Sequence, residues 1–219
     1  MKTVENPGRE RILERIRAGL RSEAFHPPAA IPVGAPIFDP VSNANALERF
    51  QAEAKANLME CFLTANPQES AASLTKALDS LPQGEIFVQD DPLLRRLVHD
   101  SRSARTVRWS SMGAPSEASQ ATLTLAEMLI AQTGSIFVTA SCGGRGASVV
   151  APCHIVLANA SQLVPDLETG LREASSRGFL DKNSFACVIS GSSRTADIEK
   201  ILVQGAHGPR RVVVIVQEA

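Results

Sequence analysis

The stretch RVVVIV at residues 211–216 is a short apolar run rich in β-branched residues. It lacks the polar–apolar alternation of a half-exposed strand, so it is typical of a strand buried on both faces. We expect further strands in EIFVQD, TVRWS, SIFVTA, CHIVLAN and FACVIS, at residues 85–90, 106–110, 135–140, 153–159 and 185–190. Buried apolar strands of this kind predict a mostly parallel sheet.

Segments with helical periodicity lie between these strands. Helices are predicted over residues 45–56, 68–80, 92–99, 166–177 and from about 194 to 204. Residues 123–132 fit a short apolar helix or a strand–helix unit, and LMECFLTA at 58–65 fits a helix end or a short strand. The alternation of strands and helices predicts an α/β fold with helices on both faces of the sheet. In such folds ligands bind beyond the carboxyl ends of the strands.

The first 44 residues differ in composition from the rest. Residues 9–22 have apolar side chains at helical spacing, and five prolines follow between 27 and 40. A proline-rich stretch favours an extended linker. We therefore predict an N-terminal helical arm with a linker (1–44) and one α/β domain (45–219).

Composition excludes several classes of function. The chain has 219 residues, with 22 Lys plus Arg against 23 Asp plus Glu, eight Phe, one Trp and no Tyr. Balanced charge and scarce aromatics argue against nucleic-acid binding. No apolar stretch is long enough to span a membrane, and the first residues lack the apolar region of a secretory signal, so a cytoplasmic location is expected. The four cysteines are too dispersed for a cluster motif, so neither a cofactor nor a metal site is predicted.

A glycine loop, SCGGRGAS (141–148), follows one predicted strand. Gly144 and Gly146 permit close approach of the backbone to a ligand, and Arg145 adds a positive charge. The spacing matches neither a dinucleotide fingerprint nor a P-loop. The loop is therefore either an anion-binding element or a flexible surface turn.

A second loop, SGSSRTADIE (190–199), follows another predicted strand. Ser192 or Ser193 is suited to cap the expected helix, and Asp197 would lie in its first turn. Gly191, Ser192, Ser193, Arg194 and Thr195 also suit an anion pocket. Capping alone and capping with binding both remain open. If these loops follow parallel neighbouring strands, Arg145 and Arg194 would converge on one edge.

Two histidines, His154 and His207, permit three arrangements with a possible function. His207, between two glycines in GAHGP (205–209), is a candidate acid or base, or a surface histidine. A triad of Ser192, His207 and Asp197 is disfavoured because no nucleophile-elbow motif is present. His154 is expected to be a core histidine with satisfied hydrogen bonds, and a metal site with Cys142 and Cys153 is disfavoured by the spacing.

These segments resemble the C-type (LutC-like) subunits of the lactate-utilisation (LUD) domain family. The resemblance rests on AQTGSIFVT (131–139), the loop through Arg145, PCHIVL (152–157) and SGSSRTADIEKILVQGAHGP (190–209). It implies a fold like the NagB/RpiA/CoA transferase group. It also implies a role in L-lactate oxidation beside iron–sulfur A-type and B-type subunits.

The chain departs from the family pattern at two places. Gln132 stands where the family usually has Glu, and Ser192 stands where it usually has Pro. If that Glu is a base in relatives, Gln132 cannot take a proton, and Glu127 is a possible substitute.

Three functions follow from this pattern. The first is a non-redox subunit of an iron–sulfur lactate-oxidising complex, with a pocket for a carboxylate or phosphate. The alternatives are a stand-alone transferase- or isomerase-like enzyme on a phosphorylated or acyl substrate, and a regulatory module that senses a small anion.

Overall fold

The computed structural model describes residues 7–21, 45–198, 201–204 and 208–218. Its main sheet has six strands in the order β1-β12-β7-β4-β2-β3, and every neighbouring pair is parallel. The expected mostly parallel α/β fold is therefore confirmed. The strands are β1 (Glu60–Thr64), β2 (Glu85–Val88), β3 (Val107–Trp109), β4 (Ser119–Leu125), β7 (Cys153–Asn159) and β12 (Arg211–Gln217).

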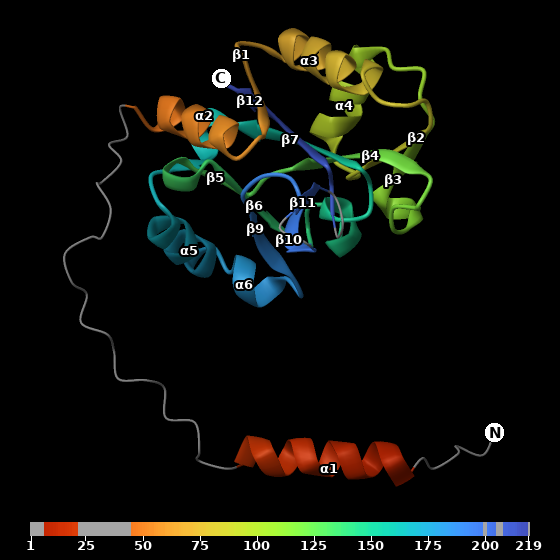
Figure 1. The fold of residues 1–219 in the computed structure, drawn as a ribbon, viewed down its shortest axis with the longest axis vertical. Coiled ribbons are helices and arrows are strands. Elements are labelled where there is room, and N and C mark those ends of the chain that lie inside the picture. The colour runs from red at the N-terminus through yellow and green to blue at the C-terminus, as the bar shows by residue number, and fades with distance from the viewer. Residues whose placement is uncertain (1–6, 22–44, 199–200, 205–207, 219) are drawn as a thin grey trace. The chain divides into compact units, whose positions relative to one another are not determined.

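Two helices cover one face of the main sheet (Figure 1). They are α3 (Pro67–Asp79) and α4 (Pro92–Ser101), and each begins with proline at its first position. The preceding Asn66 and Asp91 cap the two helices, because their side chains accept from free backbone N–H groups. Leu74 and Leu94 then pack on Leu123 and Ile155 of the sheet.

The other face is covered by α2 (Ala46–Ala56) and a second sheet (Figure 1). This smaller sheet has the order β8-β5-β6-β9, and α5 (Leu167–Ser176) and α6 (Phe179–Lys182) contribute to the core on its outer side. Gly134, with φ +59°, permits close contact with α2, since an added Cβ would lie 2.2 Å from the Ala54 backbone nitrogen. The strands are β5 (Met128–Ile130), β6 (Ser135–Thr139), β8 (Leu163–Val164) and β9 (Ala186–Ile189).

Residues 123–132 follow the strand–helix alternative more closely than the helix, whereas the helix predicted over 194–204 is wrong. Residues 123–132 contain the end of β4, then β5 and the start of a short 3-10 helix (Ala131–Thr133). The segment expected to be helical from 194 to 204 is an antiparallel hairpin of β10 (Arg194–Ile198) and β11 (Ile201–Gln204). Periodicity does not distinguish a buried strand from a helix in a short apolar run, so residues 123–132 left both alternatives open. The polar start of residues 194–204 resembled the first turn of a capped helix. The ambiguous stretch 58–65 contains β1.

The chain divides into two compact units, Met1–Asp39 and Pro40–Ala219. Within the first, α1 (Pro7–Arg21) confirms the predicted helix. Ile12 and Ile16 on this helix are 60% and 52% exposed. The proline-rich segment lies outside the described residues. No helix in the described parts of the chain is long and apolar enough to cross a membrane.

Candidate functional site

The glycine loop (residues 141–148) borders an open pocket of about 380 Å³. The opposite wall is the turn that follows β3. Gly143 and Gly144 both have φ +88°, a conformation that favours glycine, and the loop ends in a short 3-10 helix (Arg145–Ser148). The glycine-loop pocket is lined by Ser110, Gly113, Ala114, Pro115, Ala140, Ser141, Gly143, Gly144, Arg145 and Gly146. It therefore brings together three predicted ligand-binding residues, Gly144, Arg145 and Gly146.

Three backbone N–H groups of this loop are unpaired in the described part of the chain. Among the described residues, the amides of Gly143, Arg145 and Gly146 have no hydrogen-bond acceptor. Two guanidinium groups are close by. That of Arg145 donates to the Ser184 carbonyl at 3.1 Å, and that of Arg108 donates to the Ala114 carbonyl at 3.0 Å. Unpaired amides next to positive charge suit an anion.

Two side chains not singled out in the sequence hold the glycine loop. Gln89 follows β2, donates to the Ser141 carbonyl at 3.1 Å and accepts from the Leu125 amide at 2.8 Å. Asn183 accepts from the Ser141 amide and hydroxyl at 3.0 and 2.7 Å. The signal for Gln89 was its place directly after an apolar strand. The sequence around Asn183 does not indicate a role at the site, because only the tertiary fold brings this residue to the glycine loop.

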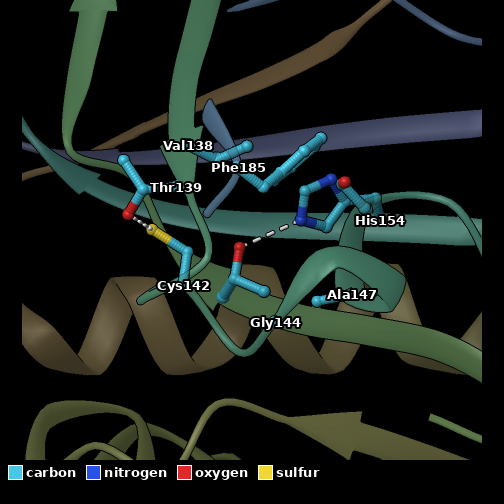
Figure 2. Close-up of a pocket in the computed structure, with 9 residues that line it drawn as sticks. Val138, Thr139, Cys142, Gly144, Ala147, His154 and Phe185 are labelled. Carbon is cyan, nitrogen blue, oxygen red and sulfur yellow. Dashed lines mark hydrogen bonds between the residues drawn. The ribbon is translucent and has the colours of Figure 1, made fainter. Parts of the chain in front are cut away.

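On its inner side the glycine loop encloses a second, smaller space, which we call the interior hollow (Figure 2). It lies between the two sheets and has no room for a water molecule. Gly144 lines both this hollow and the glycine-loop pocket, so one turn of backbone separates them. The hollow is lined by Thr124, Val138, Thr139, Cys142, Gly144, Ala147, Ser148, His154 and Phe185.

Glu127, a predicted candidate base, lies next to this hollow. Its carboxylate accepts from the Thr139 hydroxyl at 2.8 Å and from the Cys142 thiol at 3.7 Å. Burial raises the pKa of Cys142 to about 11, so the thiol stays protonated at neutral pH. Cys142 is thus a hydrogen-bond donor here and not an activated nucleophile.

His154 is a buried residue of β7, 1% exposed. Its Nε2 lies 2.9 Å from the Thr124 hydroxyl, and Figure 2 shows the ring beside Phe185. Its Nδ1 has no hydrogen-bond partner among the described residues, so the expected core position is confirmed but the expected satisfaction of its hydrogen bonds is wrong. Burial lowers the pKa of His154 to about 4, which keeps the ring neutral at pH 7. A buried polar atom without a partner costs roughly 1–3 kcal/mol.

The other predicted loop, 190–195, packs against the end of α2. Gly191 has φ +103°, and an added Cβ would lie 2.4 Å from the Asn57 carbonyl oxygen. Ser192 is 6% exposed with an unpartnered hydroxyl, and the Ser193 amide donates to the Pro209 carbonyl. Arg194 has an exposed side chain and is the first residue of the strand β10. Because a strand and not a helix begins here, the prediction that Ser192 or Ser193 caps a helix is wrong.

For the remaining predicted site residues, the structure describes the backbone without the side chain, or does not describe the residue. Thr195 pairs with Val203 in the hairpin, and Asp197 lies in β10. His207 lies outside the described residues. Gln132 contacts the backbone around α5, since its side-chain oxygen accepts from the Leu167 amide at 3.3 Å. No group of side chains suited to hold a metal ion occurs among the described residues.

The two predicted loops do not form one pocket. Strands β6 and β9 are neighbours, but they run antiparallel, with Thr139 opposite Ala186 and Ile136 opposite Ile189. The loop after β6 therefore lies at the start of β9, and the loop after β9 lies at the start of β6. The expected convergence of Arg145 and Arg194 is wrong, because it assumed parallel neighbours.

Known proteins share the sequence pattern and the fold. A protein named lactate utilization protein C from Deinococcus radiodurans is 27% identical over 93% of this chain and 91% of its own length. A protein of the same name from Halalkalibacterium halodurans is 34% identical over 44% of this chain and 43% of its own. The crystal structure of a DUF162 family protein from Deinococcus radiodurans has a TM-score of 0.62 at 22% identity, over 81% of this chain and 99% of that one. The family model of the LUD domain matches residues 47–216, and the chain thus belongs to the LUD domain family.

Proposed function

We propose that this chain is a non-redox subunit of a lactate-utilisation complex and that its glycine-loop pocket binds the carboxylate of a small acid. Family membership and the name shared by several relatives support the role in lactate utilisation. The observation that carries the pocket is the set of unpaired amides of Gly143, Arg145 and Gly146 along one wall. The complex is expected in the cytoplasm.

Charge and shape favour an anion in this pocket. The Arg145 side chain is exposed and lines the opening, so its guanidinium remains available for a planar carboxylate or a phosphate. The pocket also lies beyond the carboxyl ends of β2 and β3, since Ser110 follows β3 and Gln89 joins the loop to the end of β2. This is the edge at which parallel α/β sheets usually bind ligands.

Electron transfer would take place on partner subunits. Oxidation of lactate to pyruvate releases two electrons, and the four cysteines of this chain lie apart as free thiols, two of them buried in different places. A-type and B-type iron–sulfur subunits would supply the acceptor. This chain would bind the acid and present it.

Co-expression with candidate A-type and B-type subunits tests this role. We expect the chain alone to be colourless without stoichiometric iron, and to co-purify with brown iron–sulfur subunits as a complex that oxidises L-lactate. A brown isolated chain with bound iron and sulfide would contradict the non-redox assignment. An isolated chain that turns over a phosphorylated or acyl substrate would instead favour a stand-alone enzyme.

A further inference from the structure

The interior hollow is polar in a place where the surrounding interlayer is apolar. On this face of the main sheet, β7 and β12 contribute Val156, Ala158, Val212, Val214 and Val216. His154 and Thr124 interrupt that apolar surface where they line the hollow, and both are buried. A core built only for stability would have no reason to bury these two polar side chains and leave Nδ1 of His154 without a partner among the described residues.

We propose that the interior hollow is a second compartment of the ligand site, closed in this structure, which receives the C2 oxygen of a small 2-hydroxy or 2-oxo acid. The inference rests on the proposed function, because it places the carboxylate of the same ligand at the glycine-loop amides. His154 and Thr124 are the hydrogen-bond partners of the C2 oxygen.

The geometry around His154 supports this assignment. The ring is neutral and has one nitrogen engaged with the Thr124 hydroxyl, so the other nitrogen is left to meet a ligand. Figure 2 shows the ring and Phe185 facing the Thr139–Cys142 pair across the hollow. Apolar side chains of Val138, Ala147 and Phe185 complete the lining and suit a methyl group. A three-carbon acid has this combination of one oxygen and one methyl group at C2.

The charged groups around the glycine loop determine which end of the acid would enter the interior hollow. The Glu127 carboxylate lies 3.7 Å from the Cys142 sulfur at the inner side of the loop, so a second carboxylate would be repelled there. The unpaired amides and Arg145 lie on the outer side. The carboxylate therefore stays outside and the uncharged end points inward.

Entry requires the glycine loop to move, because the hollow has no room even for water. Gly144 forms the partition, and an added Cβ there would meet no atom within 4 Å. Residues Val149 and Val150, which follow the loop, are 49% and 41% exposed. The direction in which a Cβ of Gly144 would point is therefore open, whereas a Cβ of Gly143 would lie 3.3 Å from Phe87.

The test is calorimetric titration of the full chain with L-lactate, pyruvate and propionate. Propionate has the same three-carbon carboxylate but no oxygen at C2. We expect L-lactate and pyruvate to bind about fivefold to tenfold more tightly than propionate, the range of one hydrogen bond. His154→Phe and Thr124→Val should each abolish this preference while propionate binding persists. Thr122→Val is the matched control, since Thr122 is equally buried on the same strand but does not line the hollow.

The outcomes separate the two proposals. If wild-type protein binds propionate as tightly as L-lactate and pyruvate, or if the preference survives both His154→Phe and Thr124→Val, the second compartment is overturned. The carboxylate pocket would stand in either case, provided that Arg145→Ala weakens all three acids. If none of the three acids binds the full chain, both proposals are overturned. Thr124→Val is nearly isosteric, so it keeps the test valid if His154→Phe fails to fold.

Discussion

Arg145 and Arg194 lie at opposite ends of the strand pair β6–β9. The Arg145 guanidinium donates to the Ser184 carbonyl, just before β9 begins, whereas the Ser190 hydroxyl, just after β9, lies 2.6 Å from the Ser135 hydroxyl at the start of β6. A ligand held at the glycine loop therefore lies at the other end of this strand pair from the start of β10 at Arg194. Their separation allows one arginine to serve as the control for the other.

Replacement of Gly134 should strongly destabilise the protein. Gly134→Ala adds a Cβ 2.2 Å from the Ala54 backbone nitrogen at a φ of +59°, so α2 must shift. We expect the free energy of unfolding to fall by more than about 4 kcal/mol. Gly144→Ala, with φ +88° but no atom within 4 Å, should cost only the backbone strain of about 1–3 kcal/mol. Urea unfolding measures both, and equal losses would disprove the close contact.

His154 should make stability depend on pH between its unfolded and folded pKa values. Burial lowers the pKa of folded His154 to about 4 from its ordinary value of 6.5, so the unfolded chain binds the proton first as the pH falls. The stabilisation is complete above pH 6.5 and decreases by about 3 kcal/mol as the pH falls to 4. Urea unfolding of wild type and His154→Gln at pH 7 and 4.5 isolates this effect. The same pH dependence in both proteins would contradict it.

Cys142 should report opening of the glycine loop. Cys142 lines the interior hollow, whereas Cys153 lies in the middle of the main sheet, 0% exposed. A chain with Cys61→Ser and Cys187→Ser retains these two buried thiols. We expect a thiol reagent to modify Cys142 at least about tenfold faster than Cys153, because local opening precedes global unfolding. L-lactate should slow only the reaction of Cys142. Equal rates at both thiols would mean that the loop opens only when the fold does.

The α1 helix should mediate association with another subunit. The exposed Ile12 and Ile16 would each contribute roughly 1.5–3 kcal/mol if buried against a partner. Ile12→Ser with Ile16→Ser should therefore weaken association at least about tenfold, while Ala18→Ser should not. Removal of residues 1–42 should leave the body folded and weaken association in the same way. Sedimentation of the complex measures this, and an unchanged profile with every partner would argue against a docking arm.

Four strands of the main sheet, β2, β3, β7 and β12, were predicted from mostly apolar runs such as RVVVIV and CHIVLAN. Such runs indicate a strand because burial on both faces selects apolar side chains at successive positions. The strand β4 was not predicted over its full length, and β1 lay in a stretch that also fitted a helix end. The helices α3 and α4 could also be predicted from the sequence, because proline at the first position and a capping side chain mark where each begins.

The smaller sheet and the hairpin could not be predicted in the same way. The direction of β9 relative to β6 depends on which connection lies between them, and nothing in the apolar run 185–190 records that direction. The polar residues after β9 are as typical of a helix N-terminus as of the turn that leads into a β-hairpin, so their residue types do not distinguish the two. The pairing of His154 with Thr124 is likewise a tertiary contact between residues 30 positions apart.

We expect the anion to bind at the glycine loop and not at the 190–195 turn. Calorimetric titration of pyruvate and phosphate into wild type, Arg145→Ala, Arg145→Lys and Arg194→Ala tests it directly. We predict that Arg145→Ala weakens binding about tenfold to a hundredfold, since it removes a charge-assisted hydrogen bond, and that Arg145→Lys also weakens it. Arg194→Ala should leave the dissociation constant unchanged. A loss of affinity in Arg194→Ala with full affinity in Arg145→Ala would contradict the account.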